Sequence, residues 1–95
     1  MNYNQLLKQF TIFINTIPNK IDFYDIWEIR DIFEKLHNNF NYLNFKQKKE
    51  YLELVQKLNT ILNKVKIEKN DPLVEEEVIF LKSMIKKEKN HIKVA

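Results

Sequence analysis

The sequence predicts an all-α protein, an antiparallel up-down four-helix bundle with helices at about residues 3–16, 22–40, 45–68 and 72–89. Three observations predict this class. Apolar residues recur at intervals of three and four in four separate stretches, which is the spacing of one face of an α-helix. The chain contains no glycine, which the favoured turns of β-hairpins prefer. The stretches are joined by short connections, which favour antiparallel neighbours. A helical dimer, in which the long third helix pairs with its symmetry mate, is the alternative architecture.

The first two helices are separated by Pro18, which disfavours helical geometry at Ile17 and so ends the first helix near residue 16. Asp22 is suited to cap the second helix, and Asp25 in its first turn complements the positive helix end. The second helix carries an apolar arc of roughly 220°, wider than a helix with two bundle neighbours needs. Its central stripe consists of Ile26, Ile29, Phe33, Leu36 and Phe40.

The third helix is the longest, and its start is marked by Asn44 with Gln47 three residues later, the pattern of a capping box. Its apolar stripe follows a spacing close to that of a packed helical seam. The stripe consists of Tyr51, Val55, Leu58, Leu62 and Val65.

The fourth helix is predicted to begin at Pro72, with Asp71 as its N-cap and residues 75–77, all glutamates, in its first turns. We expect Asn90 to end it and residues 90–95 to form a tail that is either frayed or docked on the bundle. Glu77 and Glu88 project into the apolar arc of this helix. We expect Glu77 to pair with a lysine near the end of the third helix, and Glu88 to pair with the basic residues described below.

The composition indicates one ordered domain over residues 1–95, because a 44% hydrophobic content is too high for disorder. The absence of glycine excludes phosphate-binding loops and dinucleotide fingerprints. The apolar runs are too short to span a membrane, and we read no signal peptide, so we expect a cytoplasmic protein. The two histidines, His37 and His91, do not have the spacing of a pair of metal ligands, so we expect no metal and no cofactor.

Lysines are concentrated where the third helix begins and the fourth ends, and alternating helix directions would bring these segments to one end of the bundle. We call this group the basic pole. Its lysines at the start of the third helix oppose the helix dipole, which makes them candidates for binding nucleic acid or another anionic partner. A merely solvated lysine-rich end is the other reading. The pole consists of Lys46, Lys48, Lys49, Lys86, Lys87 and Lys89, and Lys93, His37 and His91 are expected to converge with it.

The second helix carries a candidate protein-binding ridge. Trp27, the only tryptophan, lies four residues after Phe23 and three before Arg30, so a guanidinium stacked on the indole is expected. Tryptophan and arginine are common anchors of protein interfaces. His37, seven residues after Arg30, lies on the same side of the helix. We therefore predict that Phe23, Trp27, Arg30 and His37 contact a partner, unless neighbouring segments cover the ridge.

Arg30 and His37 also follow the order of the Arg-x(4–6)-His motif, and these eight residues resemble the signature of HEPN ribonucleases. The resemblance implies a helical bundle in which the arginine and the histidine act on the RNA backbone, usually across a dimer. The position differs from that of the family, which places the motif late in the bundle rather than on the second helix. Ribonuclease activity is therefore retained as an alternative.

The function predicted first is non-catalytic binding: a small protein that recognises, and inhibits or regulates, a macromolecular partner. By analogy of size and architecture this resembles the style of bacteriocin-immunity proteins and phage anti-defence proteins. We expect a protein partner, with nucleic acid as the alternative and a homodimer as a further arrangement. On this reading the chain is not an enzyme.

Overall fold

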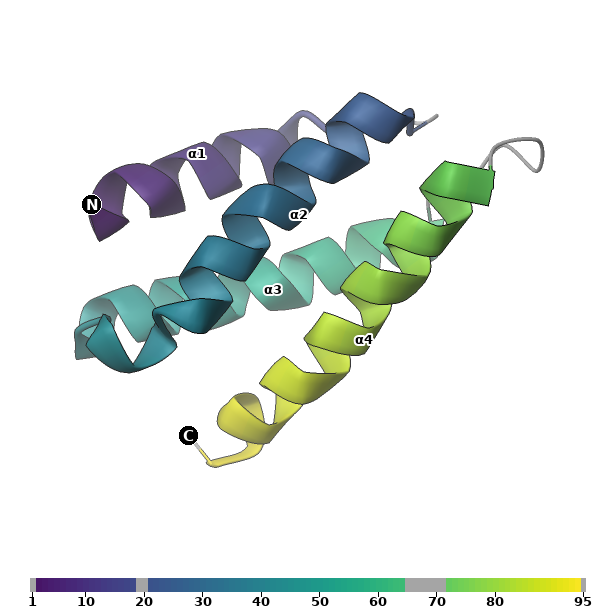
Figure 1. Cartoon of the computed structure of the whole chain (residues 1–95). Coiled ribbons are helices and arrows are strands. Elements are labelled where there is room, and N and C mark those ends of the chain that lie inside the picture. The colour runs from purple at the N-terminus through teal and green to yellow at the C-terminus, as the bar shows by residue number, and fades with distance from the viewer. Residues whose placement is uncertain (1, 19–20, 65–71, 95) are drawn as a thin grey trace.

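The computed structural model describes residues 2–18, 21–64 and 72–94, and it confirms the predicted all-α bundle (Figure 1). Four α-helices account for most of the described chain: α1 (Tyr3–Asn15), α2 (Phe23–Asn38), α3 (Phe45–Lys64) and α4 (Pro72–Val94). A single 3-10 turn, η1 (Phe40–Tyr42), lies between α2 and α3. The described ranges contain no β-strand.

Successive helices run in alternating directions, as expected, but their order around the bundle is α1–α2–α4–α3 rather than the order of the sequence (Figure 1). The helix α1 packs against α2 and α3, and α4 also packs against α2 and α3. The pairs α1–α2 and α3–α4 are antiparallel, whereas α1–α3 and α2–α4 run parallel. The packed pairs that are consecutive in the chain, α1–α2 and α3–α4, are antiparallel as predicted, and the parallel contacts are made by helices that are not consecutive. The η1 turn and the buried Leu43 carry the chain across the bundle between α2 and α3, in place of a tight hairpin.

Three helix starts are capped by side chains. The side chain of Asn2 accepts hydrogen bonds from the backbone N–H groups of Asn4 and Gln5 at the start of α1. Asp22 Oδ1 accepts from the Asp25 N–H at 2.9 Å, as predicted for α2. At α3 the predicted capping box is confirmed. Asn44 Oδ1 accepts from the Gln47 N–H at 2.8 Å, and Gln47 Oε1 accepts from the Asn44 N–H at 2.9 Å.

Two helix ends differ from prediction, and a third lies outside the described residues. The helix α2 ends at Asn38, two residues early, and η1 takes up the following residues. The structure describes α3 as far as Lys64, so residues 65–68, Val65 of the predicted stripe and the predicted Asp71 cap lie outside the described residues. The helix α4 continues past Asn90 to Val94, so the predicted end and the frayed tail are wrong for residues 90–94. Asparagine is only a weak helix breaker, and no glycine or proline follows it.

The core is one cluster of apolar side chains contributed by all four helices. At its centre three aromatic rings pack together. The ring centroids of Phe10 and Phe33 are 5.8 Å apart, those of Phe33 and Tyr51 6.1 Å, and those of Phe10 and Tyr51 6.3 Å. Burying each phenylalanine stabilises the fold by about 1.5–3 kcal/mol. These residues come from α1, α2 and α3, so the aromatic cluster fixes the positions of three helices.

Candidate protein-binding surface

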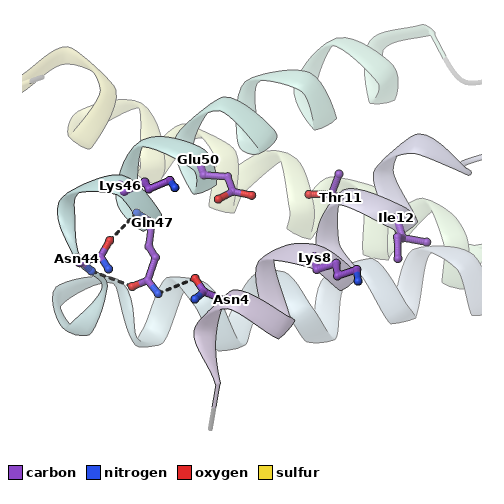
Figure 2. A pocket seen from close by; sticks show the side chains of 8 residues that line it. All are labelled: Asn4, Lys8, Thr11, Ile12, Asn44, Lys46, Gln47 and Glu50. Carbon is purple, nitrogen blue, oxygen red and sulfur yellow. Dashed lines mark hydrogen bonds between the residues drawn. The ribbon is translucent and has the colours of Figure 1, made fainter.

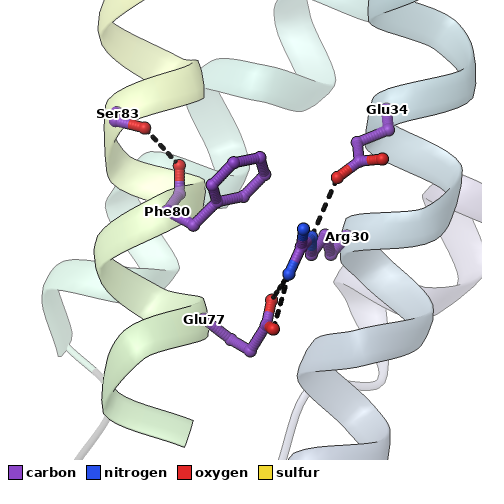
Figure 3. Close-up of polar contacts among 5 residues, drawn as sticks. All are labelled: Arg30, Glu34, Glu77, Phe80 and Ser83. Carbon is purple, nitrogen blue, oxygen red and sulfur yellow. Dashed lines mark hydrogen bonds and ion pairs between the residues drawn. The ribbon is translucent and has the colours of Figure 1, made fainter. Parts of the chain in front are cut away.

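The parallel pair α2 and α4 forms the surface on which most of the predicted ridge residues lie. We call it the α2–α4 face and define it by Trp27, Arg30 and Glu34 of α2 and by Leu73, Glu77 and Phe80 of α4. Direct contacts between Arg30 and both Glu77 and Phe80 bring the two helices together (Figure 3). Trp27 and Leu73 lie about one turn before Arg30 and Glu77 on their own helices, and so adjoin these contacts.

Arg30 is the centre of this face, and three side chains hold it. Its Nε donates to Glu34 Oε1 at 2.8 Å, and its Nη1 donates to both carboxylate oxygens of Glu77 at 2.5 and 2.6 Å (Figure 3). The carbon of its guanidinium lies 4.1 Å from the centroid of the Phe80 ring. The hydrogen bonds to Glu34 and Glu77 raise the pKa of Arg30 above its ordinary value. The guanidinium is therefore permanently charged and fixed in position.

The aromatic ridge predicted on α2 is present in part. The side chain of Trp27 is half exposed, while Phe23 is partly buried against the core and makes an edge contact with Tyr24. The predicted stacking of Arg30 on Trp27 is wrong, because the guanidinium lies over Phe80 instead. The two carboxylates of Glu77 and Glu34 draw Arg30 along the α2–α4 seam, and that position faces Phe80. Trp27 is left with its exposed surface towards solvent.

His37 lies further along the same seam and contacts a buried carboxyl group. Its Nδ1 is hydrogen bonded to Oε1 of Glu88 on α4. The side chain of His37 is 30% exposed and that of Glu88 is fully buried, so the pair links solvent to the core. Burying a carboxyl group is tolerated when it is hydrogen bonded. The structure thus pairs Glu88 with His37 rather than with the lysines we expected.

Tyr51 of α3 completes this polar cluster. Its side chain is fully buried. Burial, followed by the charge and hydrogen-bonding influence of the neighbouring Glu88, raises the pKa of Tyr51 well above its ordinary value. The phenol is therefore neutral at all ordinary pH values. His37 and Glu88 link α2 to α4, and the buried Tyr51 of α3 lies close to Glu88.

The basic pole is assembled from segments that lie towards one end of the bundle, where α2 and α4 end and α3 begins (Figure 1). Lys49, Lys86 and Lys87 are exposed. The Nζ of Lys48 lies 5.3 Å from the centroid of the Phe40 ring, within cation–π range. The side chain of Lys89 lies outside the described part of the structure.

Lys46 faces a different feature, an open groove of about 480 Å³ between α1 and α3. Figure 2 shows Gln47 in this groove, bonded to Asn44 and also donating from Nε2 to Asn4 Oδ1 at 2.9 Å. The lining is polar and carries charge of both signs, with no side chain buried in it. It is made by Asn4, Lys8, Thr11, Ile12, Asn44, Lys46, Gln47 and Glu50.

The described part of the structure adds no support for a metal site, for ribonuclease chemistry or for a membrane span. The described residues contain no group of three or more histidine, cysteine or acidic side chains placed to hold a metal ion. Arg30 and His37, the two residues of the HEPN-like pattern, are hydrogen bonded to Glu77 and Glu88 respectively. Within the described residues, none of the helices is both long enough and apolar enough to cross a membrane.

The sequence pointed to Glu77 and Glu88 as acids in an apolar arc but assigned them the wrong partners. Lysines near Glu77 and at the basic pole were expected, and Arg30 and His37 of α2 are found. The spacing of these residues along their helices could have identified the correct partners. Arg30 and His37 are separated by about two turns of α2, and Glu77 and Glu88 by about three turns of α4. Each pair therefore lies on one face of its helix. Two such faces complement each other when α2 and α4 are neighbours. Phe80 and Tyr51 were not recognised as members of these clusters.

Comparison of the chain with protein-family models, with curated proteins and with solved structures gives no match in any of the three.

Proposed function

We propose that this chain is a small non-catalytic binding protein that recognises a protein partner through the α2–α4 face. The observation that carries the proposal is a fixed arginine flanked by exposed aromatic surface. Arg30 is held by Glu34 and Glu77, and beside it Trp27 and Phe80 are 50% and 38% exposed. Tryptophan and arginine are the residues most enriched among interface anchors.

Preorganisation supports this proposal. A side chain that is already ordered loses less conformational entropy on binding, and ordering a flexible side chain costs about 0.5–1.5 kcal/mol. Arg30 is ordered by ion pairs and by contact with Phe80 before any partner arrives. The indole of Trp27 can bury its exposed half against a partner. In this proposal the protein acts in the cytoplasm and inhibits or regulates its partner by occupying a surface, in the style of immunity and anti-defence proteins.

Site-directed photo-crosslinking tests the proposal in the native cell or host. A benzophenone amino acid replaces Trp27 in one variant, and Gln56, an exposed residue of α3, in the control variant. We expect a discrete protein adduct from position 27 that does not form from position 56. The absence of an adduct at position 27, or the same adducts from both positions, would contradict a binding role for the α2–α4 face.

A second candidate function is nucleic-acid binding by the basic pole without sequence preference. It is favoured by the exposure of Lys49, Lys86 and Lys87. Phosphate-driven binding weakens steeply between about 50 and 200 mM salt. Reversal of Lys46, Lys48 and Lys49 to glutamate should abolish this activity and leave crosslinking at position 27 unchanged. If those reversals leave RNA and DNA binding intact, the basic pole is not the nucleic-acid site.

A further inference from the structure

Exposed apolar side chains gather at the end of the bundle where α2 and α4 begin. Residues 22–34 and 72–80 supply five exposed large apolar side chains, whereas the other three come from α1, η1 and the start of α3. We call residues 22–34 and 72–80 the acidic end, because acidic residues dominate their charge. Exposed large apolar side chains gathered in one region are typical of an interaction site. The five are Tyr24, Trp27, Leu73, Ile79 and Phe80.

The same two segments carry nearly all of their charge as acids. They contain eight acidic residues and one basic residue, Arg30. The whole chain has 16 basic and 13 acidic residues, so its remainder holds 15 basic and five acidic ones. Arg30 is itself neutralised by Glu34 and Glu77. The described residues of the acidic end therefore combine net negative charge with exposed aromatic side chains, on a protein whose net charge is +3. Lys20, Lys66 and Lys69 of the adjoining connections lie outside the described residues.

We infer that the acidic end docks a cationic, amphipathic segment of the protein partner. This inference rests on the proposed function and names the chemistry of its partner. Apolar residues of such a segment would cover Trp27, Leu73 and Phe80, and its lysines or arginines would meet the surrounding carboxylates. Complementary charge around an apolar centre sets partner choice and association rate. The same acids repel phosphate groups, which disfavours nucleic acid and anionic lipid at this end.

Two acids are placed to select the partner. Asp31 lies four residues after Trp27, and Glu76 lies four residues before Phe80, so each adjoins an exposed aromatic residue on its own helix. Glu76 is exposed. Asp31 pairs with Lys35 at 3.0 Å, with both side chains nearly half exposed. A surface pair of this kind contributes little stability. Asp31 can therefore exchange Lys35 for a cation of the partner at small cost.

A pair of synthetic peptides tests the inference on the full chain. Both are amphipathic helices with the same leucine face, one with lysines and the other with glutamates on the polar face, and both lack tryptophan. Trp27 is the only tryptophan of the protein, so its fluorescence reports on this surface directly. We expect the lysine peptide to shift the Trp27 emission to shorter wavelength and to bind more weakly as salt increases. We expect the glutamate peptide to bind at least tenfold more weakly, by about 1.4 kcal/mol or more.

Matched variants separate a local effect from net charge. In the test variant, Asp31→Asn and Glu76→Gln remove two charges at the acidic end. In the control, Glu50→Gln and Glu53→Gln remove two charges from exposed positions of α3. We expect affinity for the lysine peptide to fall about tenfold in the test variant and less than about twofold in the control. Circular dichroism confirms that both variants remain folded.

Several results would overturn the inference. These are the absence of binding by the lysine peptide, equal binding of both peptides, or equal losses in the test and control variants. Sedimentation of the protein alone provides a further test. Self-association that is lost in the test variant would show that the basic pole of a second copy, and not a protein partner, occupies the acidic end. Failure here is distinct from failure of the proposed function. A crosslinked partner that presents an acidic surface to Trp27 would preserve the function and reject the cationic segment.

Discussion

Arg30 of α2 and Glu77 of α4 are 47 residues apart in the chain, yet one nitrogen of the guanidinium donates to both oxygens of the carboxylate. The side chains of Arg30 and Glu77 are 32% and 15% exposed. Charge-assisted hydrogen bonds with reduced access to water are stronger than exposed ion pairs. This contact therefore fixes the relative position of two parallel helices as well as the centre of the α2–α4 face.

A double-mutant cycle should show that this contact stabilises the fold. We expect Arg30→Ala and Glu77→Ala to have a coupling energy of about 1–2 kcal/mol, measured by urea denaturation. Asp31 and Lys35 offer a matched control, because they form an ion pair on α2 with side chains 47% and 44% exposed. Their coupling should be below about 0.5 kcal/mol. Equal coupling in the two pairs would show that burial does not strengthen the Arg30–Glu77 contact.

Glu88 should be replaceable by an apolar residue without loss of stability. Buried ionisable groups often contribute no more than a well-packed hydrophobic residue of similar size. In a Tyr51→Phe background, we expect Glu88→Leu to leave the free energy of unfolding unchanged or higher. Glu88→Ala should lower it by about 2–4 kcal/mol, because a cavity remains. If leucine is as destabilising as alanine, the polar cluster itself is required for the fold.

Tyr51 should make the protein less stable at alkaline pH. In the unfolded chain the phenol loses its proton near pH 10, whereas burial and the neighbouring Glu88 raise the pKa in the folded chain. The stabilisation is complete below about pH 10 and decreases as the pH rises towards the folded pKa, by about 1.4 kcal/mol per pH unit.

The difference in unfolding free energy between the wild type and Tyr51→Phe isolates this effect. The lysines and the other three tyrosines are common to both proteins. We expect the difference to be constant up to about pH 10 and then to fall with the slope given above. A difference that stays constant at higher pH would mean that the Tyr51 phenol ionises as readily in the folded chain as in the unfolded chain.

The capping box of α3 should contribute measurably to stability. We expect Asn44→Ala to lower the free energy of unfolding by about 1 kcal/mol, since the N–H of Gln47 loses its acceptor. Asn63→Ala, at an exposed position inside the same helix, should change it by less than about 0.5 kcal/mol. Thermal denaturation followed by circular dichroism measures both. Equal effects would indicate that the hydrogen bond from Gln47 to Asn44 contributes no measurable stability.

Local features of the fold could be predicted from the sequence because they depend on residues close together in the chain. The caps at Asp22 and Asn44 and the apolar stripes of the four helices are of this kind. The helix α4 extends to Val94, past the end predicted at Asn90, because a single asparagine does not stop a helix. Propensity alone does not end a helix that nothing interrupts.

The partners of Glu77 and Glu88 could not be predicted, because they depend on which helices are neighbours. With α4 beside α2 in parallel, Arg30 and His37 become the nearest bases. A ring of antiparallel neighbours places lysines of α3 in that role. Periodicity defines the buried face of each helix but not the order of helices around the core. The sequence placed Trp27 on a ridge beside the apolar stripe of the second helix, whereas its separation from Arg30 followed from the contact of Arg30 with Phe80.

The parallel pairs α1–α3 and α2–α4 each join one helix from the first half of the chain to one from the second. Phe10 and Phe33 of the first half pack on Tyr51 of the second. Neither half can therefore complete an aromatic core by itself. A ribosome would have to release most of the second half before the first could become stable, so the helices of the two halves must fold together.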